Sequence, residues 1–245
     1  MINELVCGVR PVMEALNSDV HVEKLLIRRD MGGEAINGIK QLAVERDVPW
    51  QPVPGEKLDR LTNAAHQGVI AYISAVALQD LDEVIQQAYD RGEDPLIVAL
   101  DGVTDVRNIG AIARSAECFG AHGLLVPKHH SARLGSDAIK SSAGALLRKP
   151  VCRVMDLKEG IARARAHGLR TVACTEKTEF LLDAIDLSGP LLLILGAEDT
   201  GISPALLGQA DLRGSIPMAG KIGSLNVSVA AGIALHSVLK QRGIK

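Results

Sequence analysis

Three short polar motifs hold the residues of this chain that are best suited to chemistry. They are Asn108-Ile-Gly-Ala-Ile-Ala-Arg114, Leu195-Gly-Ala-Glu-Asp-Thr-Gly201, and Ile216-Pro-Met-Ala-Gly220 running into Ser224-Leu-Asn-Val-Ser-Val-Ala230. The planar guanidinium of Arg114 has small apolar neighbours, and an anion such as a phosphate is its natural partner. Each motif alone could also be a turn between a strand and a helix, so its meaning depends on the elements that position it.

The first motif follows a run that is typical of a buried strand, Leu96 to Leu100. A polar loop leads from this strand to Asn108, and ligands of open α/β sheets bind at the carboxyl ends of strands. Asn108 can be the N-cap of the next helix or a site residue. Arg114 would lie on the second turn of that helix, either as an ordinary exposed arginine or facing the same crevice.

The second and third motifs suit a nucleotide-like cofactor. Gly196 ends the apolar run Leu191 to Leu195 and would let the backbone pass close to a flat ligand. Three apolar residues near glycines could enclose an adenine, namely Ile216, Met218 and Leu225. A loop followed by a helix with Ser224 or Asn226 as its cap is the simpler interpretation. The chain has neither a G-x-G-x-x-G nor a G-x-x-x-x-G-K-[ST] motif, which leaves the common dinucleotide and phosphate loops without support.

Composition allows a full hydrophobic core, because the chain has 245 residues of which 47% are hydrophobic. Aromatic residues make up only 2%, and they are too scattered to form a base-stacking platform. The net charge is −2, yet residues 107–165 hold 11 Lys and Arg against 4 Asp and Glu, whereas residues 1–76 hold 8 against 10. The basic stretch can track a phosphate backbone, or it can consist of ordinary solvated helix faces.

Cysteine spacing and hydropathy favour a cytoplasmic protein. The four cysteines lie far apart without a C-x-x-C pair, which fits a reducing compartment. We expect no signal peptide, and no run reaches the roughly 18 apolar residues of a membrane span. His129 and His130 are adjacent and cannot both face one site on regular structure, so no metal site is expected.

The first 76 residues are predicted to form a small α/β unit. Apolar periodicity indicates helices at 11–16 and 34–46 and strands at 21–27 and 68–73.

Residues 77–94 are predicted to be a linker that is helix-prone over residues 81–89, because they are acidic and end in Gly92-Glu-Asp-Pro95. The remainder, residues 95–245, is predicted to contain a parallel sheet covered on both faces. The prediction depends on four apolar runs separated by helical segments, at 96–100, 123–126, 170–174 and 191–195. An amphipathic helix is expected over about 225–241.

In combination, the three motifs resemble those of the SpoU/TrmH family of RNA ribose methyltransferases. The similarity covers residues 97–245 and includes Lys140-Ser-Ser-Ala-Gly-Ala145. Gly8-Val-Arg-Pro-Val-Met-Glu-Ala-Leu16 and His66-Gln-Gly-Val69 resemble the accessory domain of the branch that methylates guanosine in bacterial 23S rRNA. The resemblance implies an α/β fold with two parts: an L30e-like RNA-binding domain at residues 1–76 and a SPOUT methyltransferase domain with a deep trefoil knot at residues 95–245. It also implies a homodimer with the active site at the subunit interface.

The same resemblance implies S-adenosylmethionine as the cofactor and assigns residues by position. Cofactor-binding positions are Gly196, Ile216, Met218 and Leu225. Catalytic-pocket positions are Asn108, Arg114, Glu198, Ser224 and Asn226. The implied reaction moves a methyl group from a sulfonium to a ribose 2′-oxygen. Arg114 would act as the base, or it would only hold a phosphate, since a guanidinium keeps its proton up to about pH 12.

Two other classes of function compete with this one. A noncatalytic RNA-binding or ribosome-assembly protein of the same fold would be favoured by loss of the Asn108, Arg114, Glu198 or Asn226 side chains, but all four are present. A nucleotide-dependent α/β enzyme of another kind would need a phosphate loop. Among methyltransferase substrates, the accessory domain favours a guanosine of 23S rRNA over tRNA.

Overall fold

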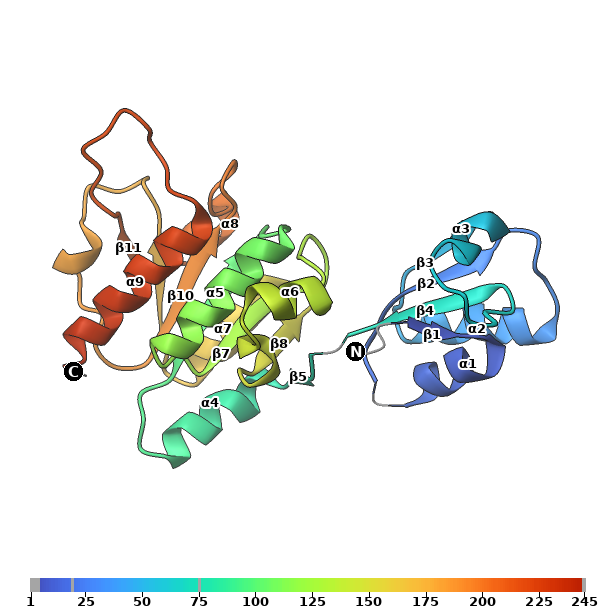
Figure 1. The fold of residues 1–245 in the computed structure, drawn as a ribbon. Coiled ribbons are helices and arrows are strands. Elements are labelled where there is room, and N and C mark those ends of the chain that lie inside the picture. The colour runs from blue at the N-terminus through green and yellow to red at the C-terminus, as the bar shows by residue number, and fades with distance from the viewer. Residues whose placement is uncertain (1–4, 19, 75, 244–245) are drawn as a thin grey trace. The chain divides into compact units, whose positions relative to one another are not determined.

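The computed structural model describes residues 5–18, 20–74 and 76–243, and the chain divides into two compact units (Figure 1). The N-terminal unit comprises residues 1–77 and the C-terminal unit residues 78–245.

The N-terminal unit is built on a four-stranded mixed sheet of order β1-β4-β2-β3, in which only β2 and β3 run parallel. Its elements are β1 (Leu5–Cys7), α1 (Val9–Asn17), β2 (Val22–Arg28), α2 (Glu34–Glu45), β3 (Trp50–Val53), α3 (Gly55–Asp59) and β4 (Val69–Ile73). Helices α1 and α2 cover one face and bury a cluster that includes Val12, Leu25 and Ile39. A smaller cluster with Leu58 of α3 lies on the other face.

The C-terminal unit contains a seven-stranded, entirely parallel sheet of order β11-β9-β10-β6-β7-β8-β5. Its elements are β5 (Leu78–Gln79), α4 (Leu81–Asp90), β6 (Leu96–Asp101), α5 (Val106–Cys118), β7 (Gly123–Pro127), α6 (Ser136–Ser141), η1 (Ala145–Leu147), β8 (Val151–Val154), α7 (Leu157–Ala166), β9 (Arg170–Cys174), η2 (Leu182–Ala184), β10 (Leu191–Gly196), α8 (Pro204–Leu207), β11 (Leu212–Gly214) and α9 (Val227–Gln241). The four strands expected from apolar runs are confirmed as β6, β7, β9 and β10. The trefoil knot stays a prediction.

Helices cover both faces of this sheet. Apolar residues of α4, α7 and α8 form one cluster with the strands. Helices α5 and α9 lie side by side on the other face (Figure 1). The layers therefore leave the carboxyl ends of the strands free to carry loops.

The prediction of a linker at residues 77–94 is wrong. Strand β5 pairs with β8 at the sheet edge, and α4 buries Leu81, Val84 and Ile85 in the core of the C-terminal unit. The helix expected over residues 81–89 is confirmed as α4, and its buried positions follow the i, i+3, i+4 spacing of an amphipathic helix. Arg163 of α7 holds this helix with ion pairs to Asp80 and Asp82.

Close packing explains a glycine of the first motif. A Cβ on Gly110 would lie 1.8 Å from Ser141 Oγ of α6, so α5 and α6 can touch only because this side chain is missing. Ser141 Oγ in turn donates a hydrogen bond to Val106 O at 3.2 Å. Gly110 and Ser141 thus fix the start of α5, where Asn108 lies.

Within residues 5–18, 20–74 and 76–243, no helix is long and apolar enough to cross a membrane. In the same part of the chain, no group of three His, Cys, Asp or Glu side chains is placed to hold a metal ion.

Candidate functional site

A cavity of about 380 Å³ lies at the carboxyl ends of β9 and β10. Three segments enclose it: the loop after β9, the loop from Gly196 to Ile202, and the stretch from Ile216 into the start of α9. The chain places β7 and β8 on one side of β6 and then crosses to the other side of β6, where it places β9, β10 and β11. Open α/β sheets bind ligands at such a reversal of strand order, and the volume is within the ~300–1,000 Å³ of small-molecule sites.

Six of the nine residues assigned from the sequence line this cavity: Gly196, Glu198, Ile216, Met218, Ser224 and Leu225. Cys174 at the end of β9 also lines it, and burial raises the pKa of its thiol to about 11. This thiol therefore stays neutral at physiological pH and is a poor nucleophile. The cavity has an apolar side and a polar rim.

Sequence reasoning missed the residues that follow β9, namely Thr175, Glu176 and Lys177. The signal was present, because these polar residues come directly after a correctly predicted strand, at the edge of the sheet where ligands bind.

Packing within the chain gives Gly196 a further reason to be a glycine, besides the expected approach of a ligand. A Cβ at this position would lie 2.1 Å from Gly201 C and 2.2 Å from Ile202 N. The loop turns back tightly, with a hydrogen bond from Gly201 N to Ala197 O at 2.8 Å. The absent side chain makes room for the chain's own backbone, so a bulky substitution at Gly196 would distort the loop before it reached any ligand.

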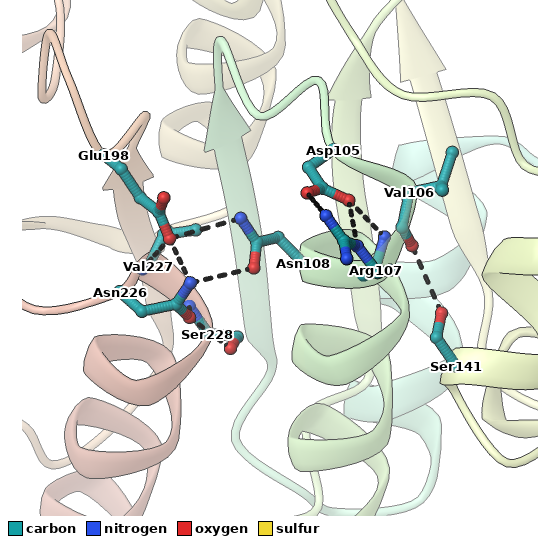
Figure 2. A network of polar contacts seen from close by, with 9 residues as sticks. All are labelled: Asp105, Val106, Arg107, Asn108, Ser141, Glu198, Asn226, Val227 and Ser228. Carbon is teal, nitrogen blue, oxygen red and sulfur yellow. Dashed lines mark hydrogen bonds and ion pairs between the residues drawn. The ribbon is translucent and has the colours of Figure 1, made fainter.

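Asn108 in the first turn of α5, Glu198 in the loop after β10 and Asn226 at the start of α9 point toward one another; we call them the polar cluster (Figure 2). Asn108 Nδ2 donates to Glu198 Oε1 at 3.3 Å, and Asn226 Nδ2 donates to Asn108 Oδ1 at 3.1 Å and also to Glu198 Oε1. The backbone N–H of Val227 donates to the same carboxylate oxygen at 3.3 Å. Since Glu198 also lines the cavity, the polar cluster lies on its rim.

Helix caps decide how these side chains are oriented. Asp105, and not Asn108, is the N-cap of α5, and its side chain accepts from Arg107 N at 2.7 Å. The Arg107 guanidinium beside it lowers the pKa of the Asp105 carboxyl. Asn226 caps α9 by accepting from Ser228 N at 2.9 Å, which turns its amide NH₂ toward Asn108 and Glu198. Asn226 thus serves as both cap and cluster member.

Arg114 does not join the polar cluster within one chain. Six residues along an α-helix place it about 120° around the axis and about 9 Å along it from Asn108. The side chain is exposed, and among the described residues it makes no hydrogen bond or ion pair. It shares an exposed stripe of α5 with Arg107 and Cys118.

Ion pairs use much of the positive charge between residues 107 and 165. Arg107 pairs with Asp105, Arg163 with Asp80 and Asp82, and Arg165 with Asp211, all acids outside that stretch. Lys149 pairs with Glu117. The local excess in the sequence therefore overstates the charge that is free to meet a phosphate backbone.

Comparisons with known proteins match both units. The SpoU rRNA Methylase family matches residues 95–236, and the family of RNA 2′-O ribose methyltransferase substrate binding matches residues 5–79. An uncharacterized tRNA/rRNA methyltransferase of Mycobacterium sp. (strain KMS) is 37% identical over 243 residues, which is 98% of this chain and 77% of that protein. The chain belongs to the SpoU/TrmH family.

Solved SpoU/TrmH structures agree with this membership. The SpoU methyltransferase AviRb from Streptomyces viridochromogenes, in complex with AdoMet, is 30% identical with a TM-score of 0.63 and covers 98% of this chain and 90% of its own. The TrmH/SpoU tRNA modifying enzyme of A. aeolicus is 27% identical with a TM-score of 0.56 and covers 66% of this chain and 84% of its own. This SpoU/TrmH protein is accordingly an S-adenosylmethionine-dependent RNA 2′-O-ribose methyltransferase.

Proposed function

We propose that this SpoU/TrmH protein methylates the ribose 2′-hydroxyl of a guanosine in 23S rRNA. The observation that carries the proposal is the cavity at the end of β10 with the polar cluster on its rim. The choice of rRNA is supported by the match of residues 95–236 to the SpoU rRNA Methylase family, and residues 5–79 match a substrate-binding family. The tRNA modifying enzyme covers only 66% of the chain, which is too little to include both units.

The residues around the cavity suit S-adenosylmethionine. Ile216, Met218 and Leu225 give apolar surface for a purine, and the carboxylates of Glu176 and Glu198 offset a positive charge. When bound, the cofactor supplies the methyl group from its sulfonium. The neutral Cys174 thiol adds no competing nucleophile.

The polar cluster holds the receiving ribose. Three N–H groups, from Asn108, Asn226 and the Val227 backbone, fix Oε1 of Glu198. Among the described residues Glu198 Oε2 makes no hydrogen bond, so it is free to accept one from a ribose hydroxyl. Ser224 lines the same cavity and offers a second hydroxyl contact.

Arg114 reaches a site only in a homodimer. The exposed stripe of α5 that holds Arg114 lies beside α9, which packs against α5. Two apolar residues of α9, Val229 and Ile233, are 49% and 38% exposed. A second copy of the chain covers this face, and Arg114 of one subunit then approaches the ribose phosphate in the pocket of the other.

This arrangement predicts that the wild-type protein is a dimer by light scattering and that Val229→Glu/Ile233→Glu is a monomer with its fold retained. Val44→Glu, at a 72% exposed apolar position of α2, serves as the matched control and should stay dimeric. A monomeric wild-type protein at micromolar concentration would contradict the dimer.

Substrate choice is tested with labelled S-adenosylmethionine and separate unmodified transcripts of 23S rRNA, 16S rRNA and tRNA. We expect label on 23S rRNA, in an alkali-resistant dinucleotide that begins with guanosine. Label on tRNA alone makes tRNA the substrate. No transfer to any RNA favours the noncatalytic RNA-binding protein.

A further inference from the structure

A second cavity, of about 370 Å³, lies at the carboxyl ends of β6, β7 and β8. The segment after β7 contributes His129 and His130, and the segment after β8 contributes Met155 and Lys158. Ser203 borders this cavity, whereas its neighbour Ile202 lines the cofactor cavity. One short segment therefore separates the two, and both open on the same edge of the sheet.

The two histidines both line this cavity, which their adjacency would prevent only on regular structure. His130 has a φ of 57°, so the segment is not regular strand or helix at this point. A residue other than glycine in this region of backbone conformation is uncommon and often marks a functional constraint. Both side chains are exposed, and among the described residues neither ring makes a hydrogen bond or ion pair.

Two carboxylates beside this cavity bind backbone N–H groups, whereas one ammonium group is exposed. Asp101 Oδ2 accepts from Ser203 N at 2.7 Å, and Asp156 Oδ1 accepts from Lys158 N at 2.9 Å, so both carboxylates hold backbone. The Lys158 ammonium is exposed and has no ion pair in the described part of the chain. Met155 is 56% exposed on the same wall.

We infer that this cavity binds a nucleotide that flanks the methylated one in the RNA substrate. The base lies against the imidazole rings and the Met155 thioether, and Lys158 meets the phosphate. Proteins that read single-stranded RNA stack bases on flat side chains, histidine included, and thioethers pack well against aromatic rings. In a chain with so few Phe, Tyr and Trp residues, these two histidines supply the flat surface. The inference rests on the proposed methylation of RNA.

The experiment measures RNA binding without methyl transfer. The probe is a labelled single-stranded RNA of about 12 nucleotides, within the ~4–16 that single-strand binding folds cover, compared with an abasic oligomer of the same length and charge. The full-length protein should bind the base-containing probe more tightly. His129→Ala/His130→Ala should weaken its binding about 10-fold and leave the abasic probe unaffected, since stacking needs a base.

Two further variants sharpen the result. His129→Phe/His130→Phe keeps flat rings without ring nitrogens and should restore most of the affinity. Lys158→Ala should weaken both probes equally and lower the salt dependence of binding by about 0.7 in log–log slope. Lys240→Ala is the matched control, because Lys240 lies near the end of α9, at the edge of the sheet opposite the cavity. Arg242, two residues further on, donates to Pro95 O and Gly189 O, which precede β6 and β10.

Cross-linking with a 4-thiouridine-containing probe should place adducts on the peptides with His129 and Met155. The inference is overturned if the double alanine variant binds both probes as the wild type does, or if Phe fails to rescue. A histidine-dependent preference for bases in a protein that methylates no RNA would refute the proposed function alone.

Discussion

The two units use their polar residues in different ways. In the N-terminal unit, polar side chains hold the chain's own backbone and turns: Gln67 Oε1 accepts from Val9 N, and His66 pairs with Asp59. In the C-terminal unit, Asn108, Glu198 and Asn226 join three segments that lie 28 to 118 residues apart in sequence, and they do so on the rim of a cavity. Parallel strands bring the segments that follow them to one edge of the sheet, where ligands bind. We therefore assign the chemistry to the C-terminal unit and substrate choice to the N-terminal unit.

The largest effect is expected at Arg114. If it takes part in proton removal, Arg114→Ala should lower turnover by about 10²- to 10⁴-fold, the usual span for loss of a general base, with cofactor affinity and dimerisation unchanged. Should it hold only a phosphate, Arg114→Lys should restore much of the activity and the alanine defect should lie largely in KM. Arg107→Ala, on the same exposed stripe, is the control. Near-normal turnover of Arg114→Ala at saturating RNA would exclude both roles.

Removal of the N-terminal unit should have the next largest effect. A chain that begins at Leu78 should fold and bind S-adenosylmethionine as the full chain does. Its kcat/KM on rRNA should fall on the order of 10²-fold, since a linked binding module raises the effective concentration of substrate. A chain that begins at Gly92 lacks β5 and α4 and should unfold at lower temperature. Full activity of the chain that begins at Leu78 on the same rRNA would contradict the assignment of substrate choice to the N-terminal unit.

A smaller loss is expected at Asn226. Asn226→Asp keeps an N-cap acceptor for α9 but replaces the amide donor with a second carboxylate beside Glu198. Methyl transfer should fall roughly 10- to 100-fold, the range for losing a hydrogen bond to a charged group, with little change in Tm. Kinetics and thermal unfolding of the same preparation check this. An equal loss of Tm and activity would make Asn226 only a helix cap.

The sequence allowed the parallel sheet to be predicted, because its central strands are apolar throughout. Strand β8 was not predicted because Arg153 interrupts its apolar run. Strand β11 was not predicted because it has only three residues and one of them is Arg213. Residues of the second and third motifs line one cavity, since strand ends and helix starts meet there.

Other features depend on contacts that a sequence does not display. The backbone of Gly201 lies against Gly196 because the loop turns back tightly. Asp105 is the cap in place of Asn108 because the helix begins three residues earlier than the motif suggested. His129 and His130 share a cavity through one unusual φ angle. Periodicity carries no information on any of these.

Calorimetry of S-adenosylmethionine binding tests the central claim most directly, namely that the cavity at the end of β10 is the cofactor site. Wild-type protein without RNA should bind the cofactor. Ala230→Phe, which adds a ring in the cavity wall on α9, should weaken binding at least about 10-fold, in line with ~1–3 kcal/mol for overpacking. Ala162→Phe, at an exposed position of α7, should bind as the wild type does. No binding by the wild type at millimolar cofactor, or equal binding by Ala230→Phe, would contradict the assignment.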